Sequence, residues 1–355
     1  MDKNLSALVL RDTGMNNNDL LKSKLPKCWT IDVLSIKEDK EEISVALPSY
    51  DVIVGGRIGM DIPRKGNLKL YQVPFTGIDW INPGELPEGV PLCNTYEHET
   101  TIAEHLLGAM IEWQTGLMRD TDKDMRSNSF NNRSINKGPH HLEMLGSTVG
   151  IIGLGRIGVE VAKRSKIFGM KVMAVSRSRK DPESFIDWVG QFDEIEKLLK
   201  ESDFIIVTLP GGEQTKSFIN HSFFRMMKPQ AVIANVGRGE VIHEAALYEA
   251  LASRRIRGAI IDVWYNYPSI SNPNPWPSRF PIEKLDNVIM SPHNSAWTLA
   301  MSNRRWEFVA ANLTRLADDE PLENICFIGE RVDYCLLYTS PSPRDISGSR
   351  MPSSA

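Results

Sequence analysis

Gly153, Gly155 and Gly158 have the spacing of a backbone cradle for the phosphate groups of a ligand. In the run Gly153-Leu154-Gly155-Arg156-Ile157-Gly158, the first glycine allows a tight turn, and the second lets backbone N–H groups approach a pyrophosphate. The third glycine lets a helix pack closely on the preceding strand. The amino terminus of that helix adds unpaired N–H donors and a partial positive charge. The spacing therefore predicts a dinucleotide-binding turn.

The residues on either side of this turn supply the elements that it needs. An apolar run at 149–152 predicts a strand, and Val161, Ala162 and Ile167 follow at helical spacing. Gly169 then ends the helix, and the apolar run 172–175 predicts a second strand. Strand, turn, helix and strand form one βαβ unit, the context that makes the glycine motif specific. The alternative is a glycine-rich turn in an unrelated α/β protein.

Four later apolar runs, at 204–209, 231–235, 258–263 and 287–290, each end in polar or glycine residues. Helical segments lie between some of them, and this alternation predicts a parallel sheet covered on both faces. Ligands of such sheets bind beyond the carboxyl ends of the strands. The residues at those ends are candidate site residues, namely Thr208, Pro210, Asn235, Arg238, Asp262 and His293.

The composition limits the class of protein. With 355 residues, 41% hydrophobic and 24% charged, the chain is long enough for two globular domains. A formal net charge of −4 gives no basic footprint for nucleic acid. No apolar stretch approaches the ~20 residues of a membrane span, and charges interrupt the amino-terminal segment, so no secretory signal is expected. The four cysteines lack metal-ligand spacing, so we expect a cytoplasmic protein without a metal site.

The part of the chain before the glycine turn has its own pattern. Apolar runs at 7–10, 31–34, 52–54 and 68–73 alternate with polar or helical stretches, which predicts a small α/β domain. Residues 99–117 have helical periodicity, and the polar stretch 119–138 predicts a surface arm or loop.

Several motifs in a fixed order resemble those of the D-2-hydroxyacid dehydrogenase family. They are LEMLGSTVGIIGLGRIG, TLPGGEQTKSFIN, MMKPQAVIANVGRGEVIHEAAL, GAIIDVW and LDNVIMSPH, and the resemblance runs from about residue 68 to 324. It implies an α/β fold: a Rossmann-type doubly wound parallel-sheet domain at 101–294, inserted in a smaller flavodoxin-like substrate domain at 1–100 plus 295–334. The implied activity is hydride transfer between a nicotinamide and C2 of a small 2-oxo or 2-hydroxy acid.

The resemblance also implies substrate-binding and catalytic roles. Arg238 matches the arginine that binds the substrate carboxylate and carbonyl, for which a permanently charged fork of donors is suited. His293 matches the acid/base histidine, whose imidazole titrates near neutral pH and can protonate the carbonyl oxygen as hydride arrives. Backbone N–H groups at Phe75, Thr76 and Gly77 would form an anion cradle for the carboxylate.

Tyr267 departs from the family pattern, because it stands where an acid accompanies the histidine. A carboxylate orients the imidazole and supports its charge, whereas a neutral phenol scarcely supports a charge. We therefore expect a lowered pKa for His293. Three interpretations follow: a variant enzyme, an enzyme that uses Glu97 or Glu99 instead, or a catalytically weak or inactive dinucleotide-binding sensor or regulatory protein.

The resemblance implies a set of cofactor-binding residues: Thr101, Gly153, Gly155, Arg156, Ile157, Gly158, Ser176, Arg177, Ser178, Leu209, Pro210, Thr215, Val236, Gly237 and Asp262. NAD-specific members end their second strand in an acid, where this chain has Ser176 followed by Arg177. A carboxylate repels a 2′-phosphate and an arginine attracts it. The expected cofactor is NADP(H), with NAD(H) as the alternative.

Family members usually form homodimers through the nucleotide domain and its first helix, so a homodimer is expected. The apolar helix at 102–117 would fit such an interface, although core packing also explains its apolar face.

The last residues resemble something else. Residues 335–355, CLLYTSPSPRDISGSRMPSSA, closely resemble the translation of a sequencing-library adapter, which predicts that they are not part of the natural protein. The alternative is a real flexible tail.

Overall fold

The computed structural model describes residues 4–13, 17–130, 134, 137–177, 183–269 and 271–330. The chain divides into two compact units: unit 1 comprises Met1–Thr95 and Arg305–Ala355, and unit 2 comprises Tyr96–Arg304. The domain boundaries expected from the sequence were 100/101 and 294/295. Ser178 and the segment 335–355 lie outside the described residues.

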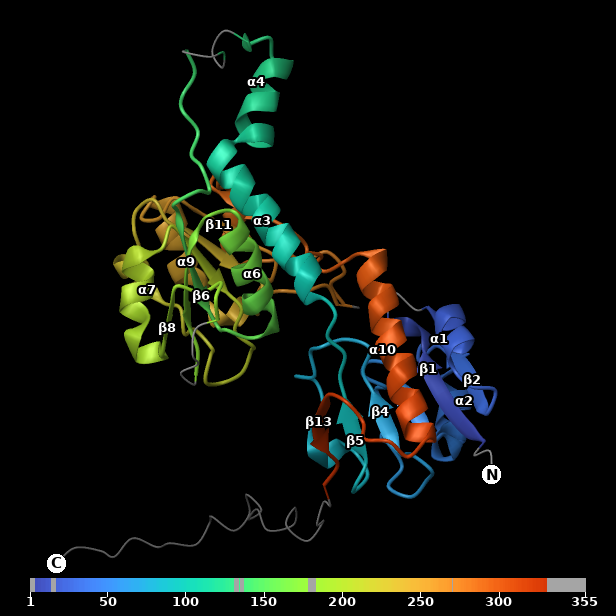
Figure 1. Ribbon diagram of the computed structural model, residues 1–355. Helices are drawn as coiled ribbons and strands as arrows, with labels where there is room; N and C mark the ends of the chain where they lie inside the picture. Colours follow the sequence, from blue (N-terminus) through green and yellow to red (C-terminus); the bar gives the residue numbers. More distant parts are fainter. Residues whose placement is uncertain are drawn as a thin grey trace, which may run out of the picture. The chain divides into compact units, whose positions relative to one another are not determined.

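Unit 2 is built on a seven-stranded parallel sheet (Figure 1). In sheet order the strands are β12 (Val288–Met290), β11 (Gly258–Ile261), β10 (Val232–Asn235), β9 (Phe204–Val207), β6 (Thr148–Ile152), β7 (Lys171–Val175) and β8 (Trp188–Gly190). The chain runs outward from β6 to β8 and then returns to β9 on the other side of β6. This reversal is the topological switch point of a Rossmann-type sheet, so the predicted doubly wound fold is confirmed.

Helices cover both faces of this sheet. Apolar residues of α3 (Glu99–Thr115) and α6 (Arg156–Ile167) form one core with the strands, and those of α7 (Ile195–Glu201), α8 (His221–Met226) and α9 (Glu244–Ala252) form the other. In β6, Val149 and Ile151 belong to the first core and Ile152 to the second. Because both faces are buried, the central strands are apolar except at their ends, which explains the continuous apolar runs in the sequence.

The segment after α3 is helical where a surface arm or loop was expected. Gly116 ends α3 with a left-handed φ of 58°, and a π-helical stretch (Leu117–Asp122) and α4 (Lys123–Arg126) follow. Arg126 Nε donates to Asp122 Oδ2 at 2.7 Å, an i,i+4 pair of the kind that supports exposed helices. The segment is exposed, as expected for a surface arm, but its first part is helical rather than a loop.

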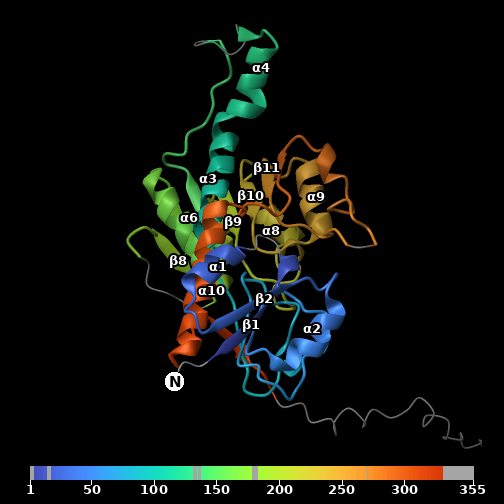
Figure 2. The same ribbon diagram turned by 90° about the vertical axis from the view of Figure 1, so that its right-hand side faces the viewer.

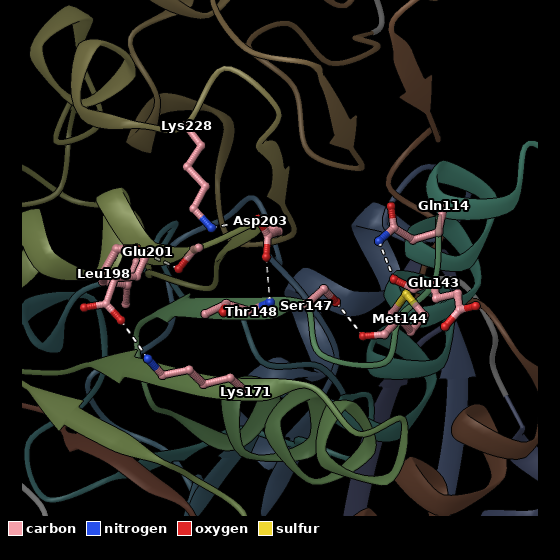
Figure 3. A network of polar contacts seen from close by, with 11 residues as sticks. Gln114, Glu143, Met144, Ser147, Thr148, Lys171, Leu198, Glu201, Asp203 and Lys228 are labelled. Atoms are coloured by element: carbon pink, nitrogen blue, oxygen red, sulfur yellow. Dashed lines mark hydrogen bonds and ion pairs between the residues drawn. The ribbon is translucent and has the colours of Figure 1, made fainter. Parts of the chain in front are cut away.

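A polar network holds the amino-terminal end of β6, the end opposite the glycine turn (Figure 3). Asp203 accepts from Thr148 N at 2.8 Å and from Lys228 Nζ at 2.8 Å, so its carboxylate joins the starts of two neighbouring strands. Lys171 Nζ donates to Glu201 Oε2 at 2.7 Å. These charged side chains therefore fix the starts of β6, β7 and β9 relative to one another. They leave the carboxyl ends of the strands free for ligand contacts.

Unit 1 contains a six-stranded sheet in the order β13 (Ile325–Ile328), β5 (Pro91–Cys93), β4 (Leu70–Gln72), β3 (Val52–Val54), β1 (Leu5–Leu10) and β2 (Trp29–Leu34). Its strands are parallel except β13, which pairs antiparallel with β5. Figure 2 shows the paired strands β1 and β2 side by side.

The helices of unit 1 complete two cores. Trp306, Val309, Ala310 and Leu313 of α10 (Leu299–Ala317) pack with one set of strand residues, and Ile43 of α2 (Lys40–Ala46) belongs to the other core. Leu21 of α1 (Asn18–Lys24) joins the first core. Single helical turns occur in the two units at Arg11–Thr13, Leu47–Ser49, Pro83–Glu85, Phe192–Glu194, Gly239–Val241 and Ile282–Lys284.

The three glycines of the turn after β6 serve different geometric needs. Gly153 has a φ of 105°, which L side chains rarely adopt. A Cβ at Gly158 would lie 2.5 Å from the carbonyl oxygen of Gly153, so α6 packs against the turn only because position 158 lacks a side chain. A Cβ at Gly155 would meet nothing within 4 Å. The space beside Gly155 is therefore open to a ligand.

Gly158→Ala should lower the free energy of unfolding by about 1–3 kcal/mol, because its methyl group forces α6 away from a backbone carbonyl. Gly155→Ala is the matched control and should leave the melting temperature near that of the wild type, since its φ of −90° suits alanine. Thermal unfolding followed by circular dichroism measures both. Equal melting temperatures for the two variants would contradict the close packing at Gly158.

Candidate functional site

A pocket of about 560 Å³ lies at the carboxyl ends of β6, β7 and β9. Its lining residues are Gly153, Leu154, Gly155, Ser176, Arg177, Phe192, Leu209, Pro210, Gln214, Thr215 and Phe218. Seven of these were expected to bind a cofactor, and the structure brings them together: Gly153, Gly155, Ser176, Arg177, Leu209, Pro210 and Thr215. Four lining residues were not predicted: Leu154, Phe192, Gln214 and Phe218. Leu154 lies in the glycine turn, and Gln214 and Phe218 lie in the motif TLPGGEQTKSFIN, so only Phe192 falls outside the motifs.

The end of β7 carries Ser176 and Arg177 into this pocket. Ser176 is buried, and its backbone N–H donates to Gly190 O at 3.1 Å, which ties the end of β7 to β8. Arg177 is exposed and is the pocket's only cation among the described residues. A guanidinium at the rim attracts anionic groups. The two described residues that directly follow β7, Ser176 and Arg177, include no acid.

The amino terminus of α6 lies against the first turn of α3. Arg156 and Ile157 open α6, and the Arg156 guanidinium lies 4.2 Å from the centroid of the Tyr96 ring. A second pocket, of about 490 Å³, is lined here by Glu99, Thr100, Leu154, Gly155, Arg156, Val159 and Glu160. Thr101, expected at the cofactor, lies in the same first turn of α3. Because the residue before α6 is Gly155, no side chain caps its first N–H groups.

The turn after β10 places Arg238. Asn235 Oδ1 accepts from Gly237 N at 3.1 Å, and Asn235 Nδ2 donates to Arg238 O at 3.0 Å. A Cβ at Gly237 would lie 2.3 Å from Leu209 O. The absence of a side chain therefore lets the turn that begins at Val236 pack directly on the loop after β9. The Arg238 side chain is half-buried, and its Nη1 donates to Gly237 O at 2.9 Å.

His293 and Tyr267 are neighbours. The centroids of their rings are 5.5 Å apart, with the planes inclined by 57°. Tyr267 is 47% exposed, and its hydroxyl accepts from Trp264 N at 3.1 Å. The backbone of His293 is left-handed, with a φ of 58°, a conformation that is uncommon for residues other than glycine.

The charges around these rings act on one another. Burial lowers the pKa of His293, the nearby charge of Arg238 lowers it as well, and the Asp262 carboxylate acts in the opposite direction. Burial raises the pKa of the Tyr267 phenol, against the effects of Trp264 N–H and Arg238. The expectation of a lowered His293 pKa is confirmed in direction, with loss of hydration as its largest cause. Tyr267 is therefore neutral and supports no charge on the imidazole.

Asp262, at the end of β11, is 1% exposed. Its carboxylate accepts from the loop that carries His293, including Ser291 Oγ at 2.5 Å and Asn294 N at 3.0 Å. The two serines of this loop, Ser291 and Ser295, were not singled out from the sequence. Their position on both sides of His293 is the sequence feature that could have identified them.

The two other carboxylates considered from the sequence have different surroundings. Glu97 has a φ of 74° and forms an ion pair with Arg304 (Oε2 to Nε, 3.4 Å). Glu99 Oε1 is buried without a hydrogen-bond partner among the described residues, and its Oε2 lies 4.0 Å from His98 Nδ1. Within the described chain no hydrogen bond or ion pair joins either carboxylate to His293.

The segment Phe75-Thr76-Gly77 lies in unit 1, after β4. Thr76 Oγ1 donates to Thr95 O at 2.9 Å, and Asn94 Nδ2 donates to Thr76 O at 2.9 Å. The Phe75 ring packs 6.5 Å from the ring of Trp80. These contacts fix the segment, and Phe75 contributes to packing within unit 1.

Two negative observations apply to the described ranges. They contain no group of three or more His, Cys, Asp and Glu side chains that could hold a metal ion. A search of the same residues finds no helix with the length and hydropathy of a membrane span.

Comparisons with known proteins identify related chains. Residues 107–295 match the sequence profile described as D-isomer specific 2-hydroxyacid dehydrogenase, NAD binding domain. The chain is 31% identical over 261 residues to glyoxylate reductase of Thermococcus onnurineus, covering 73% of this chain and 75% of that one. It is 32% identical over 280 residues to hydroxypyruvate reductase of Thermotoga maritima, covering 77% and 87%.

One solved structure extends the likeness to the fold. A D-isomer specific 2-hydroxyacid dehydrogenase family protein from Aeromonas salmonicida matches with a TM-score of 0.76 at 23% identity, covering 91% of this chain and 99% of that one.

Proposed function

The chain belongs to the D-isomer specific 2-hydroxyacid dehydrogenase family and is an NAD(P)-dependent enzyme, and on that premise we propose that it reduces small 2-oxo acids with NADPH. The main support is that the rings of His293 and Tyr267 lie 5.5 Å apart, with Arg238 near enough for its charge to lower the pKa of both. These groups offer a carboxylate-binding cation beside a proton donor.

The cofactor fits the residues present. The open space beside Gly155 leaves room for a pyrophosphate, and the uncapped amino terminus of α6 supplies N–H donors to it. Arg177, at the rim of the 560 Å³ pocket, would face the ribose, with Ser176 in place of a repelling acid. When bound, NADPH supplies the hydride. Gly153, Gly155, Arg156, Ile157, Ser176 and Arg177 would hold it.

Arg238 binds the carboxylate and the carbonyl oxygen of the substrate. Its guanidinium is always charged, and the donation of Nη1 to Gly237 O fixes the plane of the fork. A fixed fork orients C2 and polarises the carbonyl, which lowers the barrier through positioning and charge.

His293 donates the proton that the carbonyl oxygen needs. The imidazole must be protonated before reduction, and its lowered pKa means that the protonated fraction is lost at lower pH than for an ordinary histidine. The rate of reduction therefore falls as pH rises through this pKa. Tyr267 packs beside the imidazole and limits its orientations, while its raised pKa keeps the phenol neutral.

The names of the relatives suggest the size of the substrate. The relatives from Thermococcus and Thermotoga are named glyoxylate reductase and hydroxypyruvate reductase. Both acids are small and carry a carboxylate next to a carbonyl, the pattern that an arginine fork and an imidazole recognise. We take this pattern, a short 2-oxo acid, as the substrate class.

Oxidation of NADPH with glyoxylate, hydroxypyruvate and a series of bulkier 2-oxo acids tests the proposal. Turnover is expected with at least one short acid, and Arg238→Ala should reduce kcat/KM by on the order of a hundredfold or more, the cost of leaving a charged substrate group unpaired. Arg225→Ala, an exposed arginine of α8, should have little effect.

The rival is a dinucleotide-binding sensor or regulatory protein with weak or no catalysis, and Tyr267 favours it because the imidazole lacks its usual acid. Calorimetric titration with NADPH separates the two functions. Tight binding without turnover of any acid in the series would support the sensor and contradict the proposed reductase.

Arg177→Asp should reverse the cofactor preference. The wild type is expected to have a lower KM for NADPH than for NADH, and the variant should raise the KM for NADPH by about tenfold or more, because a carboxylate repels the 2′-phosphate. Arg225→Asp controls for the change in net charge. A wild type that prefers NADH would refute the assignment of NADP(H).

A homodimer is proposed through the helical segment that follows α3. Figure 1 shows α4 extending from α3 away from the sheet of unit 2. Large apolar side chains are exposed along it, namely Leu117, Met118, Met125 and Phe130. Several exposed large apolar side chains on one short segment favour an interaction site there.

Sedimentation equilibrium should give twice the monomer mass for the wild type. The variant Leu117→Gln/Met118→Gln/Phe130→Gln should shift the protein toward monomer, because it removes apolar area from the interface. Val45→Gln, at an exposed apolar position in α2, is the control and should leave the mass unchanged. A monomeric wild type would exclude this interface.

A further inference from the structure

The carboxylate of Asp262 is saturated by one short loop. Oδ1 accepts from Ser291 Oγ (2.5 Å), Asn294 N (3.0 Å) and Ser295 N (3.2 Å). Oδ2 accepts from Ser295 N (3.3 Å) and from Ser295 Oγ. Four donor groups therefore occupy the roughly four lone-pair sites of the carboxylate. Asp262 is directed at the loop around His293, which leaves little capacity for a cofactor amide.

This loop holds an unfavourable backbone conformation. His293 has a φ of 58°, a left-handed value that costs an L residue on the order of 1 kcal/mol and persists only where the surroundings impose it. The contacts that impose this conformation lie on both sides of His293: Asp262 binds Ser291 before it, and Asn294 and Ser295 after it. Ser291 is held further by Trp264 Nε1, which donates to its carbonyl at 2.8 Å.

The charge of Asp262 also acts on the imidazole. Among the described residues, Asp262 forms no ion pair, so its charge is balanced by neutral donors alone. The groups that face His293 are the neutral Tyr267 from its own loop, Arg238 from the turn after β10, and Asp262 from β11. His105 of α3 contacts this loop, with its Nε2 3.4 Å from Ser291 Oγ. Asp262 is the one acid among these groups.

We propose that Asp262 is the positioning carboxylate of His293: it fixes the loop 291–295 and supplies the negative charge that the residue at 267 does not. This role rests on the proposed function of His293 as the proton donor. It makes Tyr267 compatible with turnover, because a carboxylate still stabilises the imidazolium, from the buried side of the loop. It also assigns Ser291 and Ser295 to the same task.

Asp262→Asn tests the charge. NMR titration of the His293 imidazole should show a pKa below that of the wild type, because the opposing charge is lost while burial and Arg238 remain. The kcat for 2-oxo acid reduction at neutral pH should fall by about tenfold, more at higher pH, with the NADPH dissociation constant within about twofold of the wild type. Asp262→Asn/Tyr267→Glu should restore the pKa and part of kcat, which a merely structural role would not allow.

Glu244→Gln is the matched control. Glu244 is another buried carboxylate of unit 2, and it holds Ser278 and Arg279, away from the loop 291–295. Its loss should leave the His293 pKa unchanged. If Asp262→Asn does not fold, Ser291→Ala/Ser295→Ala tests the positioning alone: it keeps the charge, so the His293 pKa should stay near that of the wild type while kcat falls severalfold.

Two results would overturn the role of Asp262. One is an unchanged His293 pKa in folded Asp262→Asn, whether or not NADPH binding weakens. The other is an unchanged kcat in Ser291→Ala/Ser295→Ala. A wild type that reduces no 2-oxo acid refutes the proposed function instead, and the NMR titration, which needs no turnover, still decides whether Asp262 serves His293.

Discussion

The burial of both faces of the unit 2 sheet is the constraint on which the rest depends. When helices cover both faces of seven parallel strands, no side chain within a strand can reach a ligand. Chemistry can then be placed only at the strand ends, where the chain turns. Ser176, Asn235 and Asp262 all follow this rule, since each closes or follows a strand at the carboxyl edge. The opposite edge is occupied by the ion pairs and hydrogen bonds around Asp203.

This constraint explains how much could be predicted. The long apolar strands and the glycine turn were visible in the sequence, because complete burial leaves a continuous apolar run and a φ of 105° demands glycine. The strands β5, β8 and β13 were missed, whereas the equally short β3, β4 and β12 were found because each lies in an apolar run. Runs of that length carry no measurable period, and their pairing depends on neighbours far away in the chain. The helical conformation of the arm after α3 was also missed, because a polar stretch carries no apolar period that would mark a helix.

For the candidate site too, some features could be predicted from the sequence and others could not. The sequence revealed Arg238 and His293 by motif, and it revealed the absence of an acid at Tyr267. It did not reveal which donors surround Asp262, because hydrogen-bond partners between β11 and the loop 291–295 exist only once the sheet has formed. The lowered pKa of His293 was expected from the missing acid, yet its largest cause is burial, a property of the folded loop. Residue types can be read from a chain, whereas hydration and partners come from the fold.

Unit 1 is assembled from two distant pieces of chain, and this has a consequence for synthesis. Its first core needs Trp306, Val309 and Leu313 of α10, and its sheet ends in β13. A ribosome delivers Met1–Thr95 first, but these residues cannot complete their core until all of Tyr96–Arg304 has been made. The usual order, in which the amino-terminal domain folds first, is therefore reversed. Unit 2 is continuous and can complete its core before α10 and β13 are available to unit 1.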